Sequence, residues 1–187
     1  MHMAGLDHHE DMFGPVLGVA RKRATWLGIN LATTLLASYV IGLFDATIQQ
    51  VVALAVLMPV VASMGGIAGS QALTVVIGGM ALGHIGRHNA FALIRQELAV
   101  GALNSVLWAL VVAGVAVLWF DSARLGVIVG VALVANLVVA AVAGAIVPLV
   151  LRRMNVDAAL AGGVVLTTVT DVVGFITFLG LGALFLT

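Results

Sequence analysis

The chain has 187 residues, of which 63% are apolar and 9% are charged, whereas about 25% of the residues in an average soluble domain are charged. This composition excludes a soluble enzyme and a disordered chain. Eight basic residues balance eight acidic ones, so nothing favours nucleic acid as a partner, and the absence of cysteine excludes disulfides and thiolate metal sites. The class that remains is a polytopic membrane protein.

Residues 1–23 are a polar segment that ends in the basic run Arg21, Lys22 and Arg23, and we expect this segment in the cytoplasm. The rest of the chain, 24–187, is predicted to be the transmembrane domain. It contains five apolar stretches, each long enough to cross the ~30 Å hydrocarbon core as a helix of about 20 residues. Their expected bounds are 25–44, 49–82, 92–120, 125–151 and 159–186. The sequence therefore predicts an all-α integral membrane protein with five transmembrane helices.

The basic residues are distributed unevenly between the connections. Seven of the eight lie in or beside the N-terminal segment, the second-to-third loop and the fourth-to-fifth loop, and only Arg124 lies elsewhere. Positively charged loops stay in the cytoplasm, which predicts a cytoplasmic N-terminus and a C-terminus on the other side. We expect a multi-pass protein of the cell membrane, which in bacteria is the inner membrane.

The second stretch is longer than one straight span requires, and it contains Pro59 and the glycines Gly65, Gly66 and Gly69. We expect its helix to be bent or partly unwound there. Backbone groups freed by such a break are tolerated at membrane depth only inside protein or beside a water-filled path, as in channels and transporters. The alternative is an ordinary kinked helix that packs through its small residues.

Asp171 lies halfway along the last stretch, which places it near the bilayer midplane. A carboxylate at that depth costs about 2.5–3.5 kcal/mol, and no basic residue lies near the middle of a span to compensate. Thr167, Thr170 and Gly174 share its helix face. We interpret the missing positive charge as a mobile cation. The alternative is a protonated Asp171 bonded to a neighbouring helix.

Four other polar residues in the spans could have a functional or a structural role. Glu97, near the start of the third stretch, is a candidate for the residue where an ion enters, or it pairs with Arg95 or a neighbouring basic residue. The amides Gln71, Asn104 and Asn136 are expected to join helices, because intramembrane amides commonly do so.

The histidines and serines carry no catalytic signature. We interpret His2, His8 and His9 as part of a polar lead-in, with transition-metal binding as the alternative. His84 and His88 are expected in a loop. Neither a hydrolase motif nor a phosphate-binding glycine loop is present in the sequence. We therefore expect no enzymatic activity.

Two motifs in the second and fifth stretches, with single residues between them, occur in a recognisable order and spacing. Their residues are Pro59, Gly65, Gly66, Gly69, Gln71, Asn136, Pro148, Arg152, Arg153, Asp157, Thr167, Thr170, Asp171 and Gly174. This set resembles the membrane domain of the MgtE family of magnesium transporters, and the similarity extends from about Arg21 to the last residue.

The resemblance implies five helices per subunit and a homodimer in which the second and fifth helices line a central pore. It also implies that Asp171 and the backbone at Thr167 bind the transported Mg²⁺. The pore-lining positions that it implies are Pro59, Gly65, Gly66, Gly69, Thr168, Thr170 and Gly174. Two facing copies of Asp171 would repel each other unless a hydrated divalent ion lay between them.

The chain departs from the family pattern at Ile67, where relatives have asparagine, and at 162–164, where they have a polar segment with proline. Relatives also carry cytosolic magnesium-sensing domains, which residues 1–23 are too few to form. We expect a Mg²⁺ pore without these domains, or one regulated by a separate cytosolic partner. The alternatives are transport of another divalent cation, such as Mn²⁺ or Co²⁺, and a non-conducting membrane subunit.

Overall fold

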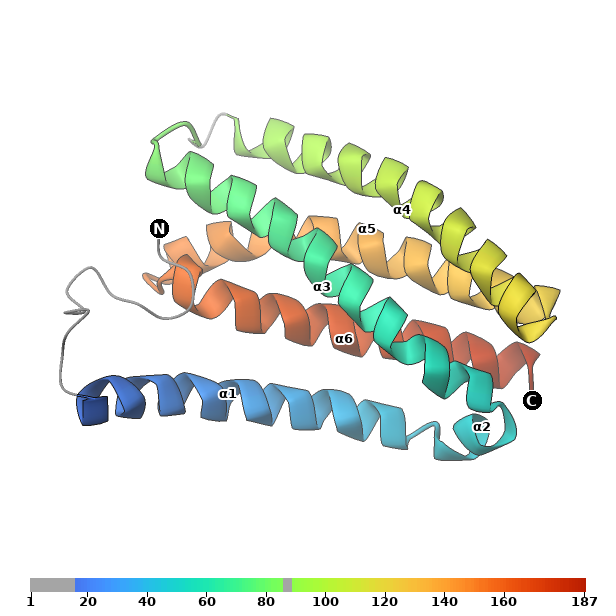
Figure 1. The fold of residues 1–187 in the computed structure, drawn as a ribbon. Coiled ribbons are helices and arrows are strands. Elements are labelled where there is room, and N and C mark those ends of the chain that lie inside the picture. The colour runs from blue at the N-terminus through green and yellow to red at the C-terminus, as the bar shows by residue number, and fades with distance from the viewer. Residues whose placement is uncertain (1–15, 86–88) are drawn as a thin grey trace.

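The computed structural model describes residues 16–85 and 89–187, and all regular structure in these ranges is helical (Figure 1). Five helices are long and apolar enough to cross a membrane, and a short sixth, α2, lies between the first two of them. The helices are α1 (Val16–Gly42), α2 (Asp45–Gln50), α3 (Val52–Ala81), α4 (Ala90–Phe120), α5 (Ala123–Arg153) and α6 (Ala158–Phe185). The predicted all-α class and the five spans are confirmed.

The first span begins earlier than the sequence analysis predicted. α1 starts at Val16, so Arg21 and Arg23 lie on its second and third turns instead of in front of the helix. Apolar composition identifies only the part of a helix that lies in lipid, whereas the hydrogen-bonded helix continues beyond that part. At 27 residues α1 is about 40 Å long, which leaves its basic end free to project beyond the hydrocarbon.

The unwinding predicted near the glycines of the second stretch is absent. α3 continues without a break through Pro59 and Gly65, and the chain instead breaks at Val51, where φ is −128° and ψ is 81°. A proline removes one backbone donor only, and lipid offers no water to bond to an unwound turn, so the glycines stay helical. His84 lies in the loop after α3, as predicted. The predictions for His2, His8, His9 and His88 lie outside the described residues.

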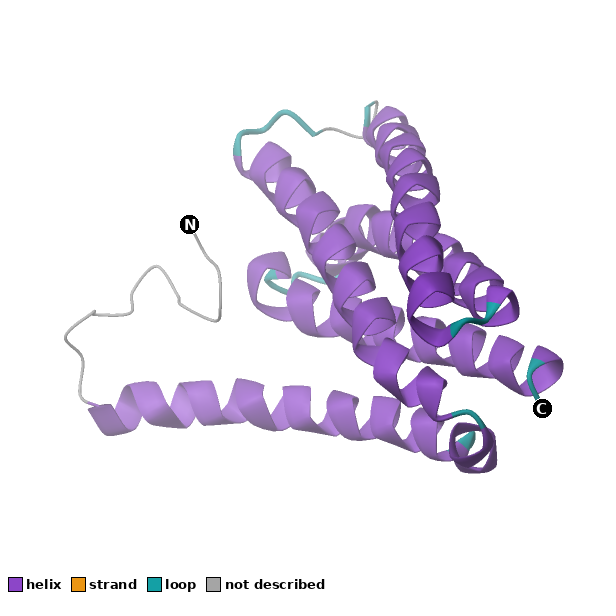
Figure 2. Ribbon diagram, turned by 45° about the vertical axis from the view of Figure 1, so that its right-hand side comes forward, coloured by secondary structure: helices purple, strands orange, loops and turns teal. Residues whose placement is uncertain are grey.

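α5 is the centre of the helix arrangement. It packs against α4 on one side and against α3 and α6 on the other, and α6 also contacts α3 (Figures 1 and 2). Fully buried side chains such as Leu133 of α5, Leu54 of α3 and Phe178 of α6 form the core between them. α1 packs against α6 at the edge and leaves most of its surface uncovered.

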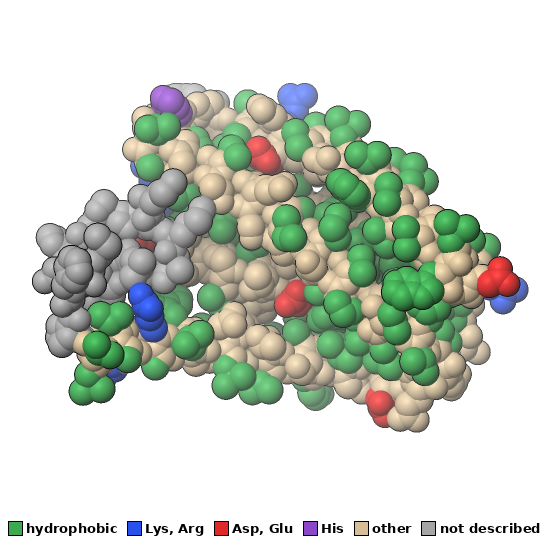
Figure 3. Space-filling model, in the orientation of Figure 1, with side chains coloured by type: hydrophobic (Ala, Val, Ile, Leu, Met, Phe, Trp, Pro, Cys, Tyr) green, Lys and Arg blue, Asp and Glu red, His purple; other side chains and the backbone are tan. Residues whose placement is uncertain are grey.

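The outer surface is apolar, as lipid requires. Hydrophobic side chains are spread across the face seen in Figure 3, and few charged groups lie among them. Leu103 and Leu118 of α4, for example, are 76% and 88% exposed. Such exposure would be costly in water but is neutral against acyl chains.

Candidate ion-binding groove

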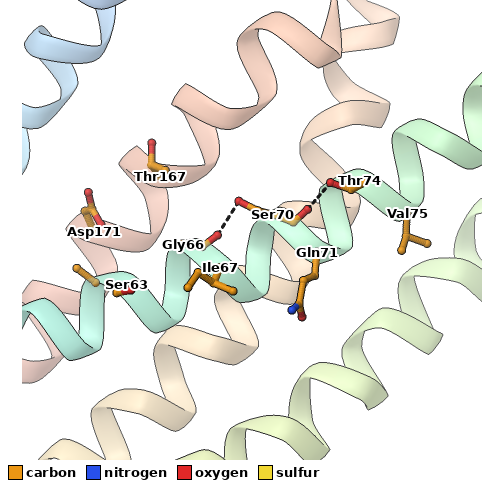
Figure 4. Close-up of a pocket in the computed structure, with 10 residues that line it drawn as sticks. Ser63, Gly66, Ile67, Ser70, Gln71, Thr74, Val75, Thr167 and Asp171 are labelled. Carbon is orange, nitrogen blue, oxygen red and sulfur yellow. Dashed lines mark hydrogen bonds between the residues drawn. The ribbon is translucent and has the colours of Figure 1, made fainter. Parts of the chain in front are cut away.

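An open groove of about 800 Å³ runs between α3 and α6. Two of the residues that line it, Thr167 and Asp171, come from α6, and both side chains project to the same side of that helix (Figure 4). The others come from α3 and are Ala62, Ser63, Gly66, Ile67, Ser70, Gln71, Thr74 and Val75. Asp171 lies halfway along α6 and is half-buried, so the groove holds one carboxylate at mid-depth.

The hydroxyl groups of the groove are arranged as acceptors. Thr167 Oγ1 lies 3.0 Å from the carbonyl oxygen of Gly163 and donates its hydrogen within its own helix. Ser70 Oγ donates to Gly66 over 2.7 Å, and Thr74 Oγ1 donates to Ser70 over 2.8 Å (Figure 4). Because the hydrogens are used in this way, the oxygen lone pairs remain available to the groove. Such oxygens suit a cation or the waters around it.

The Asp171 carboxylate has no hydrogen-bond or ion-pair partner within the part of the chain that the structure describes. The bond to a neighbouring helix, which the alternative interpretation of Asp171 requires, is therefore not seen. The charge is left facing the groove and the acceptor oxygens around it. An arrangement of one carboxylate with further oxygen ligands attracts a cation and repels an anion.

The structure divides the other predicted pore-lining residues into three groups. Gly66 lines the groove, while Gly65, Gly69, Thr170 and Gly174 are buried behind it.

Pro59 is exposed and Thr168 is half-buried, and neither lines the groove. The Thr168 hydroxyl donates to the carbonyl oxygen of Val164 over 2.7 Å, inside α6. The groove thus brings Asp171, Thr167 and Gly66 together, and the remaining predicted positions do not line it.

Asn136 of α5 supports the groove from behind. Its side chain is fully buried and its Nδ2 donates to the carbonyl oxygen of Val61 over 2.9 Å, which joins α5 to α3 as predicted for this amide. A Cβ atom on Gly174 would lie 2.7 Å from Nδ2, and one on Gly65 would overlap the same amide. The two glycines therefore allow α3 and α6 to close around Asn136.

Glu97 lies away from the groove. It lines a separate cleft between α3 and α4, and it does not form the alternative ion pair with Arg95. Gln71 and Asn104 also lack hydrogen bonds within the described residues, so the expectation that they join helices is wrong for this subunit.

The sequence analysis missed the hydroxyl groups of α3. Ser63, Ser70 and Thr74 follow one another at seven and four residues, which places them on one helix face, and this spacing is a signal that the sequence contains. Their significance depends on α6 lying beside that face, which the sequence does not show.

These features define a class: a multi-pass membrane protein with a cation-attracting groove at mid-depth. The chain belongs to the MgtE family, because the family model, described as a divalent cation transporter, matches residues 58–181. The match includes every residue that lines the groove. The family is one of transporters and not of enzymes.

Three curated relatives are each named magnesium transporter MgtE. The protein from Bacillus subtilis is 33% identical over 171 residues, which is 89% of this chain and 37% of the relative. The one from Thermus thermophilus is 33% identical over 174 residues, 92% of this chain and 38% of the relative. The one from Enterococcus faecalis is 26% identical over 184 residues, 98% and 40% respectively. The chain thus spans about two fifths of the length of these relatives.

Proposed function

We propose that this protein transports Mg²⁺ across the membrane through a pore formed by two copies of the chain, with Asp171 of each copy at the ion site. The observation that carries the proposal is the Asp171 carboxylate, which has no partner among the described residues and lies at mid-depth in a groove lined by acceptor oxygens. The names of the three relatives support Mg²⁺ as the ion.

The donor set of the groove suits a hydrated Mg²⁺ ion. Mg²⁺ gives up its waters reluctantly, and it is usually held by one or two carboxylates with several waters retained. Asp171 supplies the carboxylate, and the oxygens of Thr167 and Ser70 accept hydrogen bonds from coordinated water. A volume of about 800 Å³ accommodates the ion together with its shell.

A second copy of the chain would complete the groove. The groove is open on one side, so a single subunit does not enclose an ion path. A partner related by a twofold axis places a second Asp171 opposite the first, and the repulsion of the two carboxylates is relieved when a divalent ion lies between them. In this arrangement the ion binds between the two Asp171 carboxylates, at the interface between the two copies.

The distribution of basic residues supports one orientation of the pore. Arg21 and Arg23 near the start of α1 lie at the same end of the molecule as Arg152 and Arg153 at the end of α5 (Figure 1). Cytoplasmic placement of this end agrees with the positive-inside rule. A membrane potential that is negative inside then favours Mg²⁺ uptake by about 4.6 kcal/mol per 100 mV, because the ion carries two charges.

Transport of another divalent cation is the second candidate function. Ile67 lines the groove and is 57% exposed, at the position where the family pattern has asparagine. An isoleucine removes an amide that could bond to coordinated water, so discrimination between Mg²⁺ and ions such as Mn²⁺ or Co²⁺ is expected to weaken.

Asp171→Asn tests the proposed site, because asparagine keeps the shape of the side chain and removes its charge. We expect Mg²⁺ flux into liposomes that contain the purified chain to fall at least about tenfold, the loss of more than roughly 1.4 kcal/mol of ion stabilisation. The matched control is Asp121→Asn, at the left-handed end of α4 where φ is 51°, a conformation that asparagine accepts.

The control variant should conduct like the unsubstituted protein. Equal flux in the Asp171→Asn variant would refute the proposed ion site. Repeating the assay with Mn²⁺ and Co²⁺ as competitors separates the two candidate functions, since a selective pore keeps its Mg²⁺ flux in their presence.

A further inference from the structure

A second cleft, of about 540 Å³, lies between α3 and α4 over α5. α4 packs along α5, whereas α3 and α4 scarcely touch each other, and the cleft occupies the space left between them. Most of its lining is apolar. Three polar side chains project into it, Gln71 from α3 and Glu97 and Asn104 from α4.

The depth of these groups makes them unusual. Asn104 lies near the middle of α4, and Glu97 lies seven residues, or about 10 Å, closer to the start of the helix. Two helical turns separate them, so they share one helix face, which Trp108 extends by a further turn. A carboxylate and an amide therefore lie within the span of α4, and Gln71 adds a second amide from within α3.

None of the three polar side chains has a hydrogen-bond or ion-pair partner within the described residues. Intramembrane carboxylates without a partner are rare, because desolvation of the charge is costly unless an opposite charge or water compensates. The Asp171 groove cannot supply this compensation, since Glu97 does not line it. A ligand held in the cleft can.

We propose that the cleft between α3 and α4 binds a hydrated divalent cation, with Glu97 as the charged ligand and the Asn104 and Gln71 side-chain oxygens bonded to its water shell. A six-water shell needs roughly 180 Å³ at about 30 Å³ per water, well within the volume of the cleft. A carboxylate with two amides is an all-oxygen acceptor set that Mg²⁺ and similar hard cations prefer.

The proposed site is separate from the Asp171 groove but adjacent to it. Ile67, Gln71 and Val75 line both cavities, so one row of α3 side chains forms the boundary between them. Figure 4 shows these three side chains projecting from one edge of α3, away from Asp171. Asp171 does not line the cleft and Glu97 does not line the groove, so either carboxylate can be replaced without removing the other site's charged ligand.

Trp108 provides the reporter for this site, because it lines the cleft. In a Trp26→Phe, Trp119→Phe protein, Trp108 is the remaining tryptophan. We expect Mg²⁺, titrated into this protein in lipid nanodiscs, to produce a saturable change in Trp108 fluorescence. The change should persist in Asp171→Asn and in the control Asp121→Asn. It should be lost in Glu97→Gln and restored by Glu97→Asp, which keeps the charge.

An absent Mg²⁺ response, or one that Glu97→Gln retains, would overturn the proposal. A response lost in Asp171→Asn would also overturn it, because Trp108 would then report the groove. Asn104→Leu is a second variant, expected to weaken the apparent affinity about tenfold by removing one amide. The proposed transport function fails separately, when Asp171→Asn leaves flux unchanged, and that result does not affect the Trp108 titration.

Discussion

Thr167 and Thr168 are neighbours with the same side chain and different surroundings. Both hydroxyls donate to α6 carbonyl oxygens, but only Thr167 lines the groove. We expect Thr167→Val to lower Mg²⁺ flux about fivefold, since one acceptor contributes about 1 kcal/mol, while Thr168→Val changes flux less than about twofold. Valine keeps the branched shape in each case. Flux into dye-loaded liposomes, normalised to incorporated protein, measures both variants, and an equal decrease would remove Thr167 from the ion path.

At this scale the sequence predicted the carboxylate of the candidate site but not the α3 hydroxyl groups that line the groove. Asp171 was recognisable because a lone charge in the middle of an apolar span needs compensation, whatever the fold. Ser70 and Thr74 gave no such signal, since hydroxyls in membrane helices commonly bond to their own backbone, as these do. Gly65 and Gly174 were predicted to line the pore, but neither lines the groove, and only the packing shows that a Cβ on either would meet Asn136.

The approach of α6 to α5 depends on Gly174. A Cβ there would lie 2.7 Å from Asn136 Nδ2, whereas a Cβ on Gly180, two turns later in α6, would meet nothing within 4 Å. We expect Gly174→Ala to destabilise the protein by about 1–3 kcal/mol through overpacking, and Gly180→Ala to be neutral or to stabilise it by up to about 1 kcal/mol through helix propensity. Thermal melting of the two variants in detergent compares them, and equal midpoints would contradict this account of Gly174.

The five membrane-spanning helices could be predicted from the sequence, but the positions where the chain breaks between helices could not. Five long apolar stretches are sufficient to predict five spans, because lipid forces the backbone into helices. The same constraint explains why α3 stays continuous at Pro59, where rules learned from soluble helices predict a break. The break at Val51 gave no signal in composition, because α2 and α3 are separated by that one apolar residue.

The orientation of the whole molecule can be tested because the natural chain has no cysteine. Leu43, after α1, and Met154, after α5, are 63% and 64% exposed at opposite ends of the bundle (Figure 1). Given the positive-inside rule, we expect a membrane-impermeant maleimide to label Leu43→Cys in intact cells and to label Met154→Cys only after the membrane is opened. The reverse labelling pattern would show that the protein has the opposite orientation in the membrane. The end of the bundle that we assign to the cytoplasm would then face outward.

The proposed dimer requires that the groove of one copy faces the groove of a second copy. Ser70 of α3 lines the groove, whereas Leu118 of α4 is 88% exposed and does not. A pore that admits a hydrated ion holds facing side chains too far apart for a disulfide, so a bis-maleimide with a span of roughly 10 Å is the suitable reagent.

With that reagent, Ser70→Cys should give a species of twice the monomer mass in membranes, and Leu118→Cys should remain monomeric. Dilution of the protein with excess lipid distinguishes a stable dimer from random collision, because collisional cross-links decrease with dilution and those within a dimer do not. Cross-linking at Leu118 but not at Ser70 would place the interface on α4. The groove would then face lipid, and Asp171 would lack the second carboxylate on which the proposed ion site depends.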